Sequence, residues 1–182
     1  SCGVNAISIK MKNITNIKVQ ELTVKAFAPF GQAVLGAVGK PNYKGGSWTS
    51  LFPVAKTHLP DSELGWVITK KSKDGLIVEG MDREPEIEII WPVDKSIIQI
   101  VALAGNLNDH TEQPDANKAK AFLIKPGQVI IMKPGTWHYA AFPANSNGAF
   151  YYFITKDHPR EPGWEDVAWI PLKDKKIIEV GY

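Results

Sequence analysis

Short apolar runs separated by turn residues follow one another along most of the chain. Eight of these runs are rich in β-branched or aromatic residues and end at Gly, Pro, Asp or Asn, which is typical of β-strands. The predicted strands are residues 66–71, 76–81, 86–91, 97–104, 120–124, 128–133, 138–143 and 149–155. No amphipathic pattern of about 10–15 residues, the length of a connecting helix, lies between them. The pattern therefore predicts an all-β chain, either a closed barrel or a double-sheet jelly roll, with few short helices.

The segments outside these strands are predicted to form a short helix, a loop and a tail. Residues 20–30 have a brief helical pattern that Pro29 limits, and residues 32–35 follow as a further strand. The polar stretch 106–120 is predicted to be a loop, and a lid over the barrel mouth is one role open to it. We expect three regions: an N-terminal leader at 1–19, a β-barrel at 20–160 and a C-terminal tail at 161–182 that packs on the outside of the barrel.

Length and composition narrow the class of protein. A chain of 182 residues with 44% apolar residues can bury one sizeable core, so one domain is expected. The 21 basic and 19 acidic residues are spread along the chain, which argues against a nucleic-acid or membrane partner and favours a small molecule or a protein. Of these two we expect a small polar or anionic metabolite. Cys2 is the only cysteine, which excludes an intramolecular disulfide and suits a cytoplasmic location. Residues 1–10 are expected to be a processed or vector-derived leader, because Met11 begins a plausible start of its own.

The most informative segment for chemistry is 125–143, KPGQVIIMKPGTWHYAAFP. A predicted strand enters a Pro-Gly turn there, and the next strand begins directly afterwards. The spacing of Gly127, Gly135 and His138 resembles the second motif of cupin barrels, in which the turn aims the His side chain into the barrel mouth. His138 is therefore a candidate site residue. The alternative is a half-buried strand histidine that is hydrogen-bonded to a backbone carbonyl.

A second candidate group lies on an earlier predicted strand. Gly80 is followed by Glu86 and Glu88 at the spacing where the first cupin motif carries two histidines. Strand alternation puts Glu86, Glu88 and Ile90 on one face. If that face is inward, the two carboxylates and His138 can hold a divalent metal ion, or they can act as a general base and a substrate anchor. The alternative is that this face is exposed to solvent, which is normal for an antiparallel strand.

Several motifs resemble those of ureidoglycolate lyases, also called ureidoglycolate hydrolases. The run Phe-Ala-Pro-Phe-Gly at 27–31 resembles the family's sequence before its first strand. The run Gly-Thr-Trp-His at 135–138 is the most specific match and resembles the start of the family's Gly-Thr-Trp-His-His run. The stretch YYFITKD at 151–157 resembles its closing strand. Together these matches extend the resemblance over the whole predicted barrel.

This resemblance implies a bicupin-type β-barrel, usually a homodimer, that cleaves ureidoglycolate into glyoxylate and urea in the allantoin branch of purine degradation. It implies a site role for His138 and, as a changed residue, for Glu88, which stands where the family has a Gln four residues before a Pro. With Glu86, these two are the candidate catalytic and metal-binding residues. The candidate substrate-binding residues are Arg83, Glu84, Lys133 and Tyr139.

Two positions depart from the family's pattern. The family's Glu-Arg-His-Pro run reads Asp-Arg-Glu-Pro at 82–85, and the second His of its Trp-His-His run is Tyr139. A site that exchanges imidazoles for carboxylates and a phenol should bind a different metal, or none, and should hold an anionic substrate less readily. The resemblance therefore supports the fold more strongly than it supports the reaction.

Three functions are consistent with these residues. The first, which we favour, is a lyase acting on ureidoglycolate or a related ureido or hydroxy acid. The second is another small-molecule cupin, such as a metal-dependent isomerase or lyase. The third is a non-catalytic ligand-binding domain, since a barrel can keep its pocket and lose the chemistry. Ureidoglycolate turnover, stoichiometric metal and saturable binding without turnover are the observations that discriminate among them.

Overall fold

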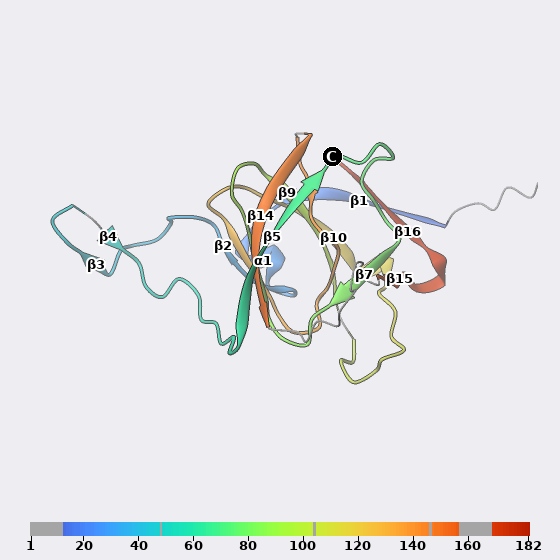
Figure 1. Ribbon diagram of the computed structural model, residues 1–182, viewed down its shortest axis with the longest axis horizontal. Helices are drawn as coiled ribbons and strands as arrows, with labels where there is room; N and C mark the ends of the chain where they lie inside the picture. Colours follow the sequence, from blue (N-terminus) through green and yellow to red (C-terminus); the bar gives the residue numbers. More distant parts are fainter. Residues whose placement is uncertain (1–12, 48, 104, 146, 157–168) are drawn as a thin grey trace, which may run out of the picture.

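Two curved β-sheets form the fold (Figure 1). The computed structural model describes residues 13–47, 49–103, 105–145, 147–156 and 169–182. The larger sheet has the strand order β15-β7-β12-β9-β10-β1-β16-β6, and β13 also pairs with β9. Its strands are β1 (Ile14–Glu21), β6 (Ile77–Val78), β7 (Gly80–Arg83), β9 (Ile97–Ala102), β10 (Ala119–Ile124), β12 (Trp137–His138), β13 (Phe142–Pro143), β15 (Ile170–Pro171) and β16 (Ile177–Gly181).

The smaller sheet has the strand order β2-β11-β8-β14-β5 and is antiparallel throughout. Its strands are β2 (Gly31–Val34), β5 (Ser62–Lys70), β8 (Glu88–Pro92), β11 (Val129–Met132) and β14 (Gly148–Lys156). The remaining elements are short: α1 (Val24–Phe27), a hairpin of β3 (Tyr43–Lys44) and β4 (Thr49–Ser50), and two 3-10 turns, η1 (Ala116–Lys118) and η2 (Lys173–Lys175). This arrangement confirms the prediction of an all-β, cupin-type barrel with few short helices.

Each of the eight predicted runs contains strand residues, and two of the runs are divided. The run at 76–81 covers β6 and the start of β7, and the run at 138–143 covers the end of β12 and all of β13. The short helix α1 lies within the predicted segment 20–30, and Thr23 caps it by accepting a hydrogen bond from the Ala26 amide. Two of the predicted strands are therefore each divided into two shorter strands, which the apolar pattern alone did not indicate.

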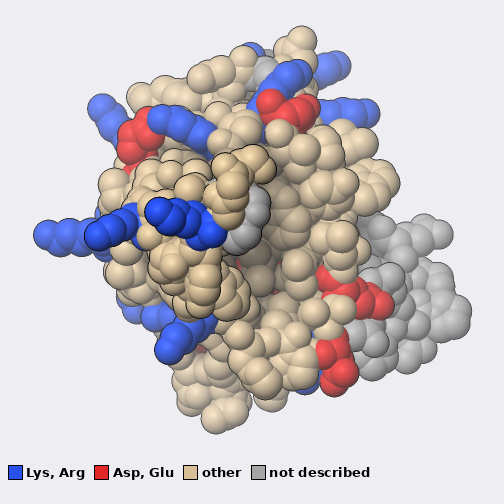
Figure 2. Space-filling model, turned by 90° about the vertical axis from the view of Figure 1, so that its left-hand side faces the viewer, with Lys and Arg blue, Asp and Glu red and all other residues tan. Residues whose placement is uncertain are grey.

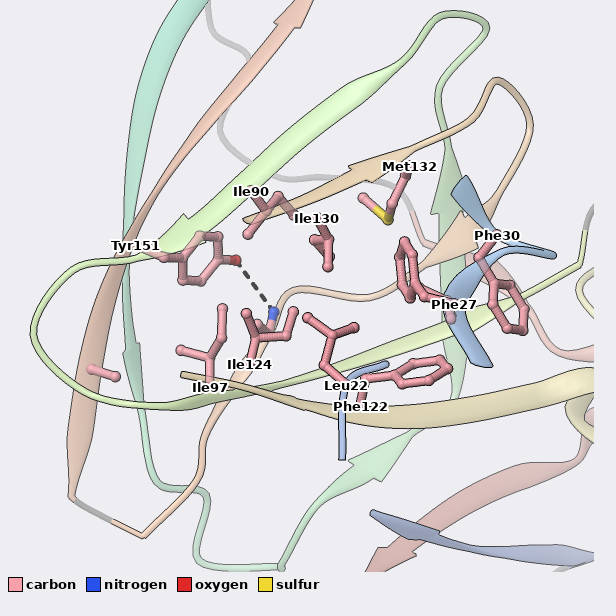
Figure 3. Close-up of a cluster of buried hydrophobic side chains, with 13 residues drawn as sticks. Leu22, Phe27, Phe30, Ile90, Ile97, Phe122, Ile124, Ile130, Met132 and Tyr151 are labelled. Atoms are coloured by element: carbon pink, nitrogen blue, oxygen red, sulfur yellow. Dashed lines mark hydrogen bonds between the residues drawn. The ribbon is translucent and has the colours of Figure 1, made fainter. Parts of the chain in front are cut away.

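The space between the two sheets is filled by a cluster of apolar side chains, which we call the interior core (Figure 3). One end of it is aromatic: the ring of Phe122 meets those of Phe27 and Phe30 at centroid distances of 5.2 and 5.8 Å. The interior core also contains Leu22, Ile90, Ile97, Val101, Ile124, Ile130, Met132, Ala141, Ala149 and Tyr151. A second cluster, formed by strands and connections of the larger sheet alone, covers the opposite face of that sheet.

Strand β9 is buried on both faces because it lies between these two clusters. Ile97 and Val101 face the interior core, whereas Ile98, Ile100 and Ala102 face the second cluster. All six residues of the strand are buried. This position explains why its sequence is apolar at every position but Gln99 and does not alternate.

The two ends of the described chain are strands of the larger sheet. Strand β1 runs parallel to both β10 and β16, so residues 14–19 of the predicted leader lie inside the sheet. Strand β16, in the predicted tail, is likewise a strand of this sheet. Residues 1–12 of the predicted leader and residues 161–168 of the predicted tail lie outside the described residues.

An arm formed by residues 35–61 extends away from the barrel and carries the β3–β4 hairpin (Figure 1). The Asn42 side chain ties its two halves together, since its amide nitrogen donates to the Phe52 carbonyl and its oxygen accepts from the Phe52 amide. Lys40, Lys44 and Lys56 lie in this arm. Figure 2 shows basic side chains gathered beside a hollow at this end of the molecule.

Within the described residues, no helix is long and apolar enough to span a membrane.

Candidate active site

The turn that precedes His138 is held in place by two other parts of the chain. The Phe30 carbonyl accepts hydrogen bonds from the Lys133 amide (2.9 Å) and from the Thr136 hydroxyl (3.0 Å). The Gly135 amide donates to the Glu84 carbonyl (2.8 Å), and Gly135 has a φ of 78°, which favours glycine. Two of the motifs that resemble the lyase family, at 27–31 and 135–138, therefore meet in space. Together they fix the direction in which β12 leaves the turn.

His138 and Glu88 form a largely buried pair on the interior face of the barrel. Nε2 of His138 lies 3.0 Å from Oε2 of Glu88, and the two side chains are 12% and 11% exposed. Nδ1 of His138 lies 3.1 Å from the Thr136 carbonyl oxygen. Because a carbonyl oxygen can only accept, Nδ1 carries a proton and donates to it. Glu88 points inward with Ile90, as strand alternation predicted.

The surroundings of His138 favour its charged form. Burial by itself lowers the pKa of the imidazole, but the negative charge of Glu88, the hydrogen bonds to Glu88 and Thr136, and the charge of Asp82 outweigh it. The net effect raises the pKa of His138 from 6.5 to about 9. At neutral pH His138 is therefore an imidazolium ion beside Glu88.

Three further polar side chains share the interior face with this pair. Asp82 lies directly opposite His138 in the pairing of β7 with β12, so the two side chains point to the same side of the sheet. Gln99, on β9, is fully buried and follows the same alternation as Val101, which lies opposite His138. Tyr151, on β14, belongs to the interior core, and burial raises its pKa, so its hydroxyl stays protonated.

The structure separates Glu86 from the pair that it was predicted to join. Glu86 precedes β8 and is about 41% exposed, and its carboxylate lies 3.7 Å from Nζ of Lys156. Among the described residues, no group of three or more His, Cys, Asp or Glu side chains is placed to hold a metal ion. The predicted metal-binding set of Glu86, Glu88 and His138 is therefore not assembled, and Glu88 with His138 supplies only two donors.

The four predicted substrate-binding residues lie apart from the Glu88–His138 pair or on the other face of its sheet. Arg83 is opposite Trp137 in the strand pairing, and its guanidinium lies 4.4 Å from that ring while it also binds Glu112. The Tyr139 ring packs on Phe142 and Trp169 beside the second cluster. Lys133 is exposed, and Glu84 is half-buried next to the Gly135 turn. None of these four placements tests substrate binding, which stays a prediction.

Sequence reasoning did not single out Gln99 or Tyr151. For Gln99 a signal was present, because it is the one polar residue in the otherwise apolar stretch of β9. A polar side chain in a strand that is buried on both faces needs a partner, and this requirement could have identified it. Tyr151 lies in an aromatic run, AFYYFIT, in which the sequence does not distinguish it from its neighbours.

A shallow depression on the outer face of the smaller sheet lies away from these residues. Its apolar lining includes Trp66, Ile68, Phe150 and Tyr152. None of its lining residues belongs to the polar group on the interior face. The chemistry and this hollow are thus on opposite sides of the smaller sheet, and the polar interior is the better candidate for an active site.

Known proteins with similar folds share little sequence with this chain. Hydroxypropylphosphonic acid epoxidase from S. wedmorenis is 15% identical with a TM-score of 0.36, over 53% of this chain and 44% of that chain. RmlC from Streptococcus suis, in complex with dTDP-D-xylose, is 13% identical with a TM-score of 0.39, over 66% of this chain and 61% of that chain. A dTDP sugar isomerase from Desulfovibrio desulfuricans G20 is 10% identical with a TM-score of 0.45, over 80% and 88% of the two chains. The first two matches thus span less than two thirds of those proteins.

Sequence comparison is more specific than these structural similarities. A search of curated proteins finds no match to the chain. The sequence profile of ureidoglycolate lyase, however, matches residues 66–175, a segment that includes Glu88, Gln99, His138 and Tyr151. Because this match covers more than half of the chain, the protein belongs to the ureidoglycolate lyase family.

Proposed function

We propose that the protein is a lyase that cleaves ureidoglycolate, or a closely related ureido acid, into glyoxylate and urea. The observation that carries this proposal is the pairing of Glu88 with His138 at 3.0 Å on the interior face of the barrel. His138 holds a transferable proton at neutral pH beside the carboxyl group of Glu88, which gives acid–base catalysis a proton donor next to a proton acceptor.

The reaction needs one group that removes a proton and one that supplies a proton. Glu88 accepts the proton of the substrate hydroxyl as the carbon–oxygen double bond of glyoxylate forms. The carbon–nitrogen bond breaks, its electron pair goes to nitrogen, and that nitrogen takes the Nε2 proton of His138 as urea leaves. The proton on Glu88 then returns to His138 across their short contact, which restores the pair and balances the reaction.

The surrounding backbone and side chains keep both groups ready for these steps. The Thr136 carbonyl fixes the orientation of the imidazole through Nδ1, so that Nε2 faces Glu88. The raised pKa of His138 keeps the proton donor loaded at neutral pH. Because about a tenth of the surface of each side chain is exposed, the pair is in contact with solvent while most of its environment is apolar.

A metal ion is not required by these steps and does not fit the side chains of the described residues. Divalent metal sites in proteins usually have three or more protein donors, whereas Glu88 and His138 are two. A metal ion at this pair would also have to displace a proton from the His138 imidazole, whose pKa is raised to about 9. We therefore assign no step to a metal ion.

The test is a product assay on purified protein. Wild-type protein supplied with ureidoglycolate is expected to release urea and glyoxylate in equal amounts. Glu88→Gln and His138→Gln should each lower kcat by about 10²–10⁴-fold, the usual loss when a general acid or base is removed. Glu179→Gln, which changes an exposed carboxylate on β16, is the matched control and should retain activity. A folded wild-type protein that releases neither product would overturn the proposal.

A further inference from the structure

The side-chain amide of Gln99 is buried in one fixed orientation. Its Nε2 donates to the carbonyl oxygens of Tyr139 (2.6 Å) and Ile100 (3.1 Å). A flipped amide would place Oε1 against these two acceptors, so the hydrogen bonds themselves determine which atom faces them. The Gln99 side chain is fully buried, and its Oε1 has no hydrogen-bond partner in the described part of the protein. A buried acceptor without a partner is costly, which indicates that a donor is supplied from elsewhere.

The hydroxyl of Tyr151 lies at the same short stretch of backbone. Its oxygen accepts a hydrogen bond from the Ala141 amide, which the dashed line in Figure 3 marks. Gln99 is bonded to the carbonyl of Tyr139, so the two side chains are anchored within two successive peptide units of the connection between β12 and β13. Since the Tyr151 oxygen already accepts, its proton is left to donate into the interior.

These two groups belong to the same interior as the Glu88–His138 pair. Gln99 lies two residues from Val101 on β9, which is directly opposite His138 in the sheet. Tyr151 lies on β14, the strand that pairs with β8, and β8 carries Glu88. The negative charge of Glu88 also contributes to the raised pKa of Tyr151. Gln99 and Tyr151 are more deeply buried than the pair, at 0% and 3% exposure.

We propose that Gln99 and Tyr151 recognise the ureido end of the substrate. Gln99 Oε1 accepts a hydrogen bond from a ureido N–H, and the Tyr151 hydroxyl donates to the ureido carbonyl. An acceptor beside a donor is complementary to an N–H beside a C=O, which a ureido group has and a simple hydroxy acid lacks. This inference rests on the proposed function for the identity of the substrate, but it concerns binding and not catalysis.

Two unreactive ligands of the same shape test it by calorimetry. Ureidoacetate has the carboxylate and the ureido group of the substrate but no hydroxyl, so it cannot be cleaved. 4-Oxopentanoate keeps the carboxylate and the carbonyl and replaces both nitrogens by carbon, so it lacks the N–H groups. Wild-type protein is expected to bind ureidoacetate at least about 10-fold more tightly, because an unpaired buried acceptor costs about 1–3 kcal/mol.

The variants separate the two roles. Gln99→Leu should lower the affinity for ureidoacetate by about 10-fold or more. It should also remove the preference for ureidoacetate over 4-oxopentanoate, because 4-oxopentanoate has no N–H that binds Gln99. Tyr151→Phe should lower the affinity for both ligands to a similar extent, since both have the carbonyl group that the Tyr151 hydroxyl would bind. Gln32→Leu is the matched control, because the Gln32 amide donates to the Lys56 carbonyl outside the barrel interior, and it should change neither affinity. Far-ultraviolet circular dichroism checks that each variant is folded, and Tyr151→Phe carries the test if Gln99→Leu does not fold.

The outcomes distinguish this inference from the proposed function. A Gln99-dependent preference for ureidoacetate in a protein that does not cleave ureidoglycolate would support the recognition and overturn the lyase. Turnover of ureidoglycolate with no change of preference in Gln99→Leu, or no loss of affinity in Tyr151→Phe, would overturn the recognition and leave the lyase standing. Equal binding of the two ligands by wild-type protein would show that Gln99 Oε1 is satisfied by a water molecule, and this too would overturn the inference.

Discussion

Nε2 of His138 lies 3.0 Å from Oε2 of Glu88, and the two residues belong to different sheets. His138 is on β12 of the larger sheet and Glu88 is on β8 of the smaller one. The pair is therefore a polar bridge between the two sheets. Its ionisation should affect the stability of the barrel as well as its chemistry, and both effects can be measured.

Replacing Glu88 by Gln should lower the pKa of His138. Burial opposes the imidazolium, and the Glu88 charge is the largest of the contributions that outweigh it. Removing that charge leaves burial opposed only by the Thr136 hydrogen bond and by Asp82, so the pKa should fall well below about 9. Titration of the histidine resonances by NMR measures it. Glu86→Gln, which removes the carboxylate paired with Lys156, should leave the His138 titration unchanged. A shift in that control would show that Glu86 belongs to the site.

The stability of the wild-type protein should decrease on the alkaline side of neutrality. His138 has a folded pKa of about 9 against an ordinary value of 6.5, so its contribution to stability is fully present below pH 6.5 and is lost as pH rises through 9. Urea unfolding at a series of pH values from 6 to 10 measures the free energy of unfolding. In Glu88→Gln this decrease should be absent or reversed, because the charged imidazole is no longer stabilised. An identical decrease in the variant would contradict the assignment to this pair.

The fold was largely predictable because most of its strands follow local patterns. Runs such as 149–155 are rich in aromatic and β-branched residues and end at turn residues, and β14 lies there. Strands β1 and β16 escaped prediction for a different reason. They pair in parallel, Ile14 with Ile177, and each depends on a partner far away in the sequence. Such pairing leaves no local turn signal that a single sequence can show.

The candidate site was predicted in part. The glycine spacing before His138 correctly indicated a turn that directs this side chain inward, and alternation gave the inward face of Glu88. Arg83 was selected from its position in a motif, yet it follows Asp82, which faces His138, so alternation puts Arg83 on the other face. Gln99 comes to the site through the pairing of β9 with β12. That pairing is a property of the folded sheet and not of any one segment.

Arg83 is expected to hold the loop that follows β9 against the barrel. Its guanidinium lies 2.5 Å from the Glu112 carboxylate and 2.7 Å from the Asp109 carbonyl, and its side chain is 11% exposed. Arg83→Ala should lower the free energy of unfolding by about 1–3 kcal/mol, since it leaves the partly buried Glu112 carboxylate without its partner. Hydrogen exchange in residues 106–112 should accelerate more than exchange in β14. Lys125→Ala, which removes an exposed ion pair with Glu21, should cost less than about 1 kcal/mol. Equal costs would show that Arg83 does not anchor the loop.

Gly31 should tolerate no side chain, because the adjacent strand of its sheet occupies the space. A Cβ at Gly31 would lie 1.9 Å from the Ile131 carbonyl oxygen, which is backbone and cannot move aside without disturbing the pairing of β2 with β11. Gly31→Ala should therefore lower the free energy of unfolding by about 1–3 kcal/mol, the usual cost of overpacking. It should also loosen the Phe30 carbonyl that anchors the turn before His138, so kcat for ureidoglycolate should fall in protein that is still folded. Gly181→Ala is the matched control, because nothing lies within 4 Å of its Cβ, and it should leave stability and kcat unchanged. If Gly31→Ala reduced stability but left kcat unchanged, the 27–31 motif would serve the fold alone and would not position the site.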